Sequence, residues 1–187
     1  MNDPRATARA IDALRRGWPV AIDGVVTVLA IESADMVRLA AFDPANEADI
    51  LISSTRAVTL KLANQLAAAT AGEPVIVART SWLDLAVATA LSDPATDLAN
   101  PLMGPFSAIP VAHSKASAAA LELARHAGLL PAFFVRTGIH DPAESVSSEG
   151  VTAWDAPDRL AIAARAKLPV AAAEHAELQW VERAQLA

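Results

Sequence analysis

The chain contains no cysteine among its 187 residues. This absence excludes disulfide bonds, zinc sites built on thiolates, iron–sulfur clusters and cysteine nucleophiles. Only His, Asp and Glu remain as metal ligands, and the four histidines show no HExxH or other i, i+4 spacing. We therefore predict no metal site and no cofactor.

Long apolar runs and basic clusters are also missing. No run approaches the roughly 20 residues of a membrane-spanning helix, although 53% of the residues are hydrophobic. Residues 1–17 lack the apolar core of a secretion signal. A net charge of −6 and a pI of about 5.1 argue against nucleic-acid binding, which needs a concentrated basic surface. We predict a cytoplasmic protein that binds neither membranes nor nucleic acid.

Motifs of common enzyme classes are missing too. The sequence has no GxGxxG stretch and no P-loop, and Ser81 lies outside any GxSxG context. No internal repeat is visible.

The hydrophobic pattern predicts alternating strands and helices after an opening β-meander. An Asp23-Gly24 hairpin turn joins the first two strands of that meander, because both residues tolerate positive φ. We expect strands at residues 19–22, 25–31, 36–42, 50–52, 74–78, 106–111, 132–135 and 151–154. We expect helices at residues 4–16, 55–69, 83–91, 114–127 and 155–166. Pro110 marks an edge strand. This order favours one α/β (α+β) domain with a mixed sheet flanked by helices.

Residues 114–136 form the clearest unit, a helix followed by a stop and a buried strand. Ser114 or Ser117 is suited to cap the helix. Gly128 is placed for a left-handed stop, and Pro131 cannot continue the helix.

Two segments of the chain resemble 3,4-dihydroxy-2-butanone 4-phosphate synthase. Residues 122–132, ELARHAGLLPA, resemble its D-L-A-R-L-A-G-L-x-P-A segment, and residues 11–20, IDALRRGWPV, resemble its opening A-I-x-A-L-R-x-G-x-P-V. With residues 59–66 and 127–135, the chain looks most like the degenerate synthase-like domain that precedes some bacterial GTP cyclohydrolase II catalytic domains. The resemblance covers roughly residues 8–165. It implies that family's fold, a homodimer, and a role in riboflavin biosynthesis.

The departures from the family argue against synthase activity. The family's acidic loop, which binds a divalent cation, is reduced to Asp23-Gly24. Counting back from Gly128, the His, Thr and Glu of its G-H-T-E-A motif fall on Ala116, Ser117 and Ala118. The glutamate of its C-E-I motif falls on Thr137. Cyclohydrolase activity, which in that family uses a zinc held by three cysteines, is excluded for this chain alone.

We therefore expect residues 1–167 to form a degenerate synthase-like domain. Residues 168–187 resemble a lead-in to an absent cyclohydrolase catalytic domain. Whether the chain is an enzyme is left open, with a non-catalytic role favoured and no catalytic residue assigned.

Ligand contacts are predicted in two places. His113 and Ser117 lie near the start of the 114–127 helix, and Arg136, Thr137 and His140 follow a buried strand, at the strand end where α/β sites gather. The sequence favours a solvent-facing linker residue over a ligand contact for His113, and a solvated loop over a pocket for the polar residues between 136 and 149. Residues 137–150 as a whole are predicted to be a polar loop. Asp23 is either a turn former or a base. Glu32 either points into the ancestral cleft or pairs at the surface.

Three functions remain open from the sequence. The first is a non-catalytic domain that supports, regulates or dimerises GTP cyclohydrolase II. The second is a sensor of a flavin or a sugar phosphate in the ancestral cleft. The third is an enzyme with a new site there, although no local motif shows the converging polar groups that this would need.

Overall fold

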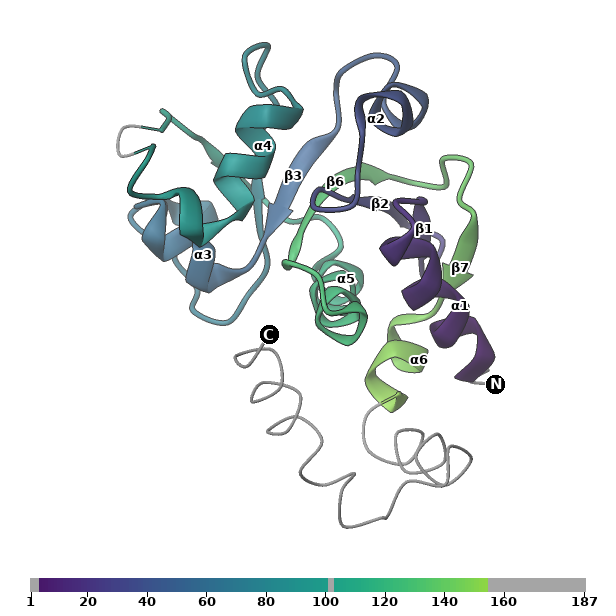
Figure 1. The fold of residues 1–187 in the computed structure, drawn as a ribbon. Helices are drawn as coiled ribbons and strands as arrows, with labels where there is room; N and C mark the ends of the chain where they lie inside the picture. Colours follow the sequence, from purple (N-terminus) through teal and green to yellow (C-terminus); the bar gives the residue numbers. More distant parts are fainter. Residues whose placement is uncertain (1–3, 101–102, 155–187) are drawn as a thin grey trace, which may run out of the picture.

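The computed structural model describes residues 4–100 and 103–154 and confirms the predicted α/β class (Figure 1). A mixed sheet has the strand order β5-β4-β3-β6-β2-β1-β7. Neighbouring strands pair antiparallel except β1 and β7, which are parallel. The strands are β1 (Val20–Ile22), β2 (Val26–Ala30), β3 (Asp49–Ile52), β4 (Val75–Val77), β5 (Ala108–Ile109), β6 (Ala132–Thr137) and β7 (Glu144–Val146).

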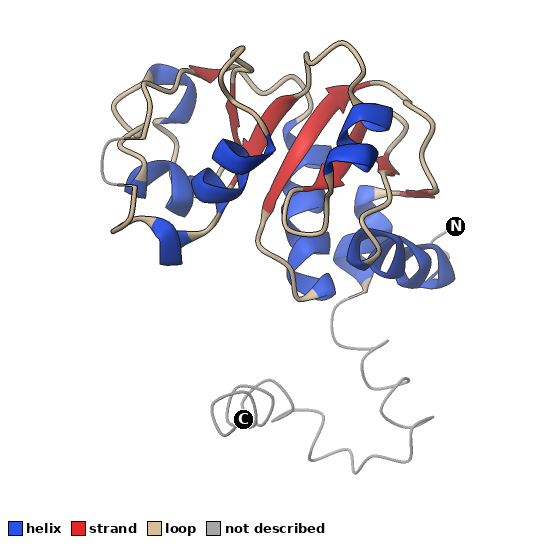
Figure 2. Ribbon diagram, turned by 45° about the horizontal axis from the view of Figure 1, so that its top comes forward, coloured by secondary structure: helices blue, strands red, loops and turns tan. Residues whose placement is uncertain are grey.

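Helices cover both faces of the sheet (Figure 2). They are α1 (Pro4–Arg15), α2 (Met36–Phe42), α3 (Ser54–Thr59), α4 (Leu85–Ser92), α5 (Ser114–Ala127) and α6 (Ser148–Ala153), with short 3-10 helices at Leu66–Ala68 and Pro94–Thr96. Helices α1, α5 and α6 pack on one face, where Phe133 is fully buried. Helices α2, α3 and α4 pack on the other, where Phe134 is fully buried. Consecutive residues of β6 thus anchor the two layers, as the two-residue period of a strand requires.

The predicted hairpin and edge strand are confirmed. Asp23 and Gly24 have φ of 52° and 67° and join β1 to β2. Strand β5, just before Pro110, lies at one edge of the sheet. Edge positions tolerate a residue that cannot donate a ladder hydrogen bond.

The predicted meander is wrong, because residues 36–42 form helix α2 instead of a third strand. Asp35 caps this helix, and its carboxylate accepts a hydrogen bond from the N–H of Arg38. Leu39 and Phe42 then point into the core at helical spacing. Strand β6, distant in sequence, takes the place beside β2.

The helix predicted at residues 55–69 is too long. Helix α3 ends at Thr59, and Lys61 has a left-handed φ of 59°. Arg56 is only 6% exposed and donates two hydrogen bonds, of 2.6 and 2.7 Å, to the Asp97 carboxylate. The hydrogen bond from Arg56 lowers the pKa of Asp97. This pair ties α3 to the segment after α4, a contact that periodicity cannot reveal.

The region after β6 also differs from the prediction. Residues 137–150 were expected to be a loop, but they contain β7 and the start of α6. The strand predicted at residues 151–154 is wrong, because Ser147 caps α6 and accepts a hydrogen bond from the N–H of Gly150. The helix predicted at residues 155–166 and the boundary at residue 167 lie outside the described residues.

Candidate functional site

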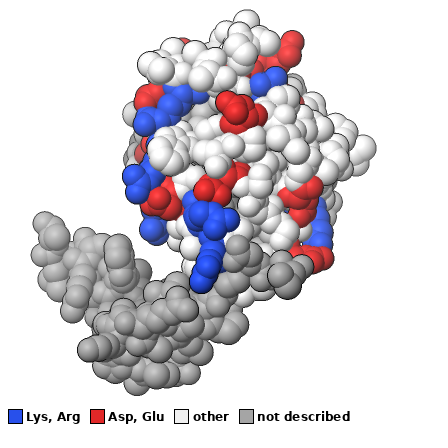
Figure 3. Space-filling view, turned by 90° about the vertical axis from the view of Figure 1, so that its right-hand side faces the viewer, with Lys and Arg blue, Asp and Glu red and all other residues white. Residues whose placement is uncertain are grey.

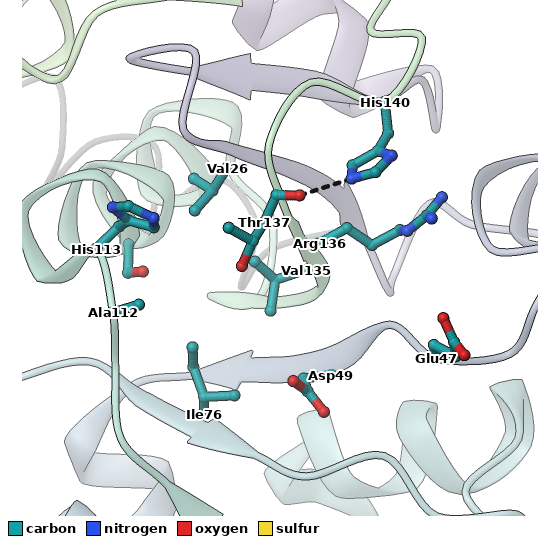
Figure 4. A pocket seen from close by; sticks show the side chains of 11 residues that line it. Val26, Glu47, Asp49, Ile76, Ala112, His113, Val135, Arg136, Thr137 and His140 are labelled. Atoms are coloured by element: carbon teal, nitrogen blue, oxygen red, sulfur yellow. Dashed lines mark hydrogen bonds between the residues drawn. The ribbon is translucent and has the colours of Figure 1, made fainter.

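A pocket of about 320 Å³ lies on the α5 face of the sheet, beside the start of α5 (Figure 4). Its floor is apolar, with Val26 from β2, Ile76 from β4 and Val135 from β6. Polar side chains form the walls. The polar or charged lining residues are Glu47, Asp49, His113, Ser117, Arg136, Thr137 and His140.

Helix α5 begins at this pocket without a side-chain cap. His113 occupies the N-cap position, but its side chain accepts no hydrogen bond from the helix. The predicted capping by Ser114 or Ser117 is therefore wrong. The first N–H groups of a helix have no partner within it, and the start of α5 lies beside the pocket.

Ser117 lies one turn into α5 and is buried with only 1% of its surface exposed. Ser117 is one of the lining residues, and its hydroxyl is buried and has no hydrogen-bond partner among the residues that the structure describes. Buried hydroxyls in folded proteins are normally paired, so an unpaired one on a pocket wall calls for an explanation.

The loop after β6 carries His140 to the opposite wall of the pocket. In Figure 4, His113 and His140 lie on different sides, with Thr137 between them. One ring nitrogen of His140, Nε2, lies 2.7 Å from the backbone oxygen of Thr137. A carbonyl oxygen only accepts hydrogen bonds, so Nε2 carries the proton.

Arg136 extends toward the side of the pocket where Glu47 lies (Figure 4). Its Nη1 donates a 2.8 Å hydrogen bond to the backbone oxygen of Phe42, at the end of α2. The guanidinium thus has one donor engaged and several left, because an arginine carries five N–H groups. It supplies the pocket wall with a permanent positive charge.

Asp49 opens β3, and one of its carboxylate oxygens accepts a 2.8 Å hydrogen bond from the backbone N–H of Arg79. The Arg79 guanidinium lies over the ring of Phe134, on the other face of the sheet. Burial lowers the pKa of Arg79, against the raising effect of the Asp43, Asp84 and Asp49 carboxylates. Arg79 therefore helps to hold Asp49 through its backbone, while its side chain belongs to the other layer.

All five residues predicted as ligand contacts line this one pocket: His113, Ser117, Arg136, Thr137 and His140. Glu47 and Asp49 were missed by the sequence reasoning. Antiparallel pairing places Asp49 opposite Val135, so the beginning of β3 meets the end of β6. A search of strand ends alone could not find a residue at a strand start.

The two carboxylates left open by the sequence are engaged elsewhere. The Asp23 side chain accepts a 2.8 Å hydrogen bond from the N–H of Ser148 and stabilises the hairpin end. Glu32 accepts a 2.6 Å hydrogen bond from the N–H of Leu130. Neither lines the pocket.

Charges are mixed on the face shown in Figure 3, where acidic and basic side chains of the described residues alternate. Within residues 4–100 and 103–154, no three His, Asp or Glu side chains come close enough together to hold a metal ion. In the same part of the chain, no helix has the length and apolar character needed to cross a membrane.

The sequence matches no protein-family model, and no curated protein shows significant similarity to it. Conclusions about function therefore depend on the geometry of the pocket, and the resemblance to the synthase family stays a prediction.

Proposed function

We propose that this chain is a non-catalytic domain that binds a small phosphorylated metabolite, of sugar-phosphate size, in the pocket beside α5. The buried, unpaired hydroxyl of Ser117 carries this proposal. Rotation of the Ser117 side chain toward the pocket would let a bound ligand supply the hydrogen bond that the described residues do not supply.

The wall groups favour an anionic ligand at the start of α5. Uncapped N–H groups and the positive end of the helix dipole attract phosphate. Arg136 and the two imidazoles, His113 and His140, add further donors. Across the pocket, Glu47 and Asp49 offer oxygens that accept hydrogen bonds from sugar hydroxyls. A phosphorylated polyol has both kinds of group, whereas inorganic phosphate has only one.

The volume of the pocket favours a small ligand. Its roughly 320 Å³ lies at the lower end of the range of about 300–1,000 Å³ that is usual for ligand pockets. Of the ligands considered from the sequence, flavin nucleotides and GTP are much larger than a pentose phosphate. The pocket size therefore favours the sugar phosphate.

A non-catalytic role is supported by the positions of the acidic groups. The resemblance implies that Asp23 is what remains of the family's acidic loop, and its carboxylate accepts a hydrogen bond from the backbone N–H of Ser148. The synthase reaction, as the resemblance implies, needs a metal held by clustered carboxylates. Among the described residues, Glu47 and Asp49 are the carboxylates that line the pocket, and we expect binding without conversion.

Calorimetric titration with ribulose 5-phosphate, inorganic phosphate, flavin mononucleotide and GTP tests the proposal. We expect ribulose 5-phosphate to bind most tightly and Ser117→Ala to weaken it by roughly tenfold, the value of one buried hydrogen bond. Ser145→Ala, an exposed serine on β7, is the matched control and should leave affinity unchanged. Absence of binding, or equal effects of both substitutions, would contradict the proposal, and turnover of ribulose 5-phosphate would contradict its non-catalytic part.

A second candidate, an association domain, is favoured by the outer surface of α2. Met36 and Val37 are 65% and 79% exposed, and Ala40 and Ala41 beside them are exposed as well. A homodimer or the predicted GTP cyclohydrolase catalytic domain would cover such a surface. Light scattering tests this on the chain and on Val37→Lys, each alone and mixed with a GTP cyclohydrolase catalytic domain. A dimer that the substitution leaves intact would contradict the candidate. A chain that stays a monomer both alone and in the mixture would contradict it as well.

A further inference from the structure

Thr27 is a fully buried polar residue near the start of β2, and its hydroxyl makes two hydrogen bonds to the loop that carries His140. Its Oγ1 donates to the backbone oxygen of Gly138 at 2.7 Å and accepts from the N–H of His140 at 3.1 Å. Both partners are more than 110 residues away in sequence. One hydroxyl thereby fixes both the start and the end of the turn at residues 138–140.

The turn is also held at its base. The N–H of Gly138 donates a 2.6 Å hydrogen bond to the backbone oxygen of Val25. Gly138 itself has a φ of 92°, in the left-handed region that favours glycine. The two Thr27 hydrogen bonds add restraints on the turn beyond this bond at its base.

The position of this turn decides how the His140 ring faces the pocket. The ring bonds through Nε2 to the backbone oxygen of Thr137, only three residues away. That bond fixes the proton on Nε2 and leaves Nδ1 without a partner among the described residues. A change in the turn would break this short-range bond and let the ring exchange between tautomers.

We infer that Thr27 is a positioning residue for ligand binding: it holds the turn at residues 138–140 so that His140 presents one defined tautomer to the pocket. The inference rests on the proposed function for its ligand, but the ring geometry is independent of it. Thr27 pairs directly with Arg136 in the sheet, so the same strand position also lies beside the cationic wall.

Thr27→Val and Thr27→Ser separate positioning from packing. Valine keeps the shape and the strand preference but removes the hydroxyl, whereas serine keeps the hydroxyl. We expect Thr27→Val to weaken ribulose 5-phosphate binding by roughly threefold to tenfold, the value of one or two neutral hydrogen bonds. Thr27→Ser should remain within about twofold of the unmodified chain on the same reasoning. Thr89→Val, an exposed helix threonine, is the control for the chemical change and should have no effect.

Nitrogen NMR of the His140 imidazole measures which ring nitrogen carries the proton, a property that a change in packing alone would not alter. We expect a single Nε2–H tautomer for His140 in the unmodified chain and in Thr27→Ser, and a mixture of tautomers in Thr27→Val. Unchanged ring spectra and affinity in Thr27→Val, or equal losses in both variants, would overturn the inference.

The experiment also covers a Thr27→Val variant that does not fold and an unmodified chain that binds no ligand. If Thr27→Val does not fold, His140→Ala replaces it, and an affinity equal to that of the unmodified chain would overturn the role of His140. If the unmodified chain binds none of the four titrated compounds, the proposed function fails, and the ring spectra alone then decide whether Thr27 positions His140.

Discussion

The two ends of helix α5 are built in opposite ways. At its C-terminal end, Gly128 takes a left-handed φ of 70°, and the N–H groups of Gly128 and Leu129 bond back to helix carbonyls. Arg15 reaches across from α1 and donates a 2.8 Å hydrogen bond to the backbone oxygen of Ala127. The protein itself thus supplies the partners for this end of the helix.

At the N-terminal end of α5, the described residues supply no side-chain partners of this kind. The N-cap residue His113 makes no side-chain cap, and the buried Ser117 hydroxyl has no hydrogen bond to any part of the chain that the structure describes. A folded chain gains nothing from leaving polar groups unpaired unless something else binds them. The C-terminal end thus belongs to the scaffold, and the contrast between the two ends is what our proposal of a ligand site at the N-terminal end rests on.

The largest predicted effect concerns the scaffold that follows the C-terminal end. Phe133 in β6 is fully buried among α1, α5 and the sheet. We expect Phe133→Ala to lower the free energy of unfolding by about 3–5 kcal/mol, because it removes a large apolar side chain and leaves a cavity. Urea denaturation measures this. Val37→Ala, on an exposed side chain, should change stability by less than about 0.5 kcal/mol, and a similar loss in both variants would contradict the assignment.

Gly128→Ala tests the helix stop itself. Apart from the adjacent chain, no heavy atom of the described residues lies within 4 Å of a Cβ added at this position, so we expect the cost to come from the left-handed backbone. We expect a loss of about 1–2 kcal/mol for an L-residue there. Gly128→Asn should lose less, since asparagine tolerates this conformation. Thermal melting compares the stability of the two variants. A larger loss of stability for Gly128→Asn would show that the left-handed backbone is not what favours glycine at this position.

The sequence predicted the scaffold end well because its signals are local. A glycine after an apolar helix and a proline three residues later specify a stop without any tertiary contact. The fold class and most strands follow from the same kind of local pattern. The prediction took helix α2 for a strand because residues 36–42 are largely apolar. The feature that identifies the helix start is the hydrogen bond that the Asp35 carboxylate accepts from the N–H of Arg38.

The site was only partly predictable from the sequence. The five predicted contacts do meet at one pocket, because they follow the end of β6 or precede α5. Glu47 and Asp49 join them only through antiparallel pairing of β3 with β6. Short strands with similar apolar patterns do not reveal that pairing. The unpaired state of Ser117 depends on which residue caps the helix, and the sequence favoured a serine.

Ser117→Ala tests the other end of α5, with an effect of opposite sign on stability. Removing an unpaired buried hydroxyl should raise the free energy of unfolding by about 1 kcal/mol in the absence of ligand. Ser92 is the matched control, since it is equally buried but donates a 2.9 Å hydrogen bond to Thr89. Ser92→Ala should therefore lower stability. Chemical denaturation of both variants decides this, and a loss at Ser117 would mean that its hydroxyl already has a partner.

Two neighbouring arginines provide the finest comparison. Arg15 bonds across to the end of α5, whereas Arg16, which directly follows α1, bonds back to Asp12 at 2.8 Å, where both side chains are exposed. We expect Arg15→Ala to cost about 0.5–1.5 kcal/mol, the value of a typical hydrogen bond. Arg16→Ala should cost less, because exposed ion pairs contribute little. Urea denaturation at pH 7 measures both variants. Equal losses of unfolding free energy would contradict the view that Arg15 stabilises the fold more than Arg16 does.

The two arginines should also differ in their response to acid. The hydrogen bond from Arg16 lowers the pKa of Asp12 below its ordinary value of 3.8. A lowered pKa in the folded state contributes stability above the ordinary value, and this contribution is lost as the pH falls through the lowered pKa. The part of the Arg16→Ala cost that comes from Asp12 should therefore be lost progressively as the pH falls below 3.8. Most of the Arg15→Ala cost should persist, because the backbone oxygen that Arg15 bonds does not titrate. Urea midpoints at pH 7 and in acid would show this, and a cost of Arg15→Ala that disappears with Asp12 protonation would mean that Arg15 acts through the surface carboxylate and not through the end of α5.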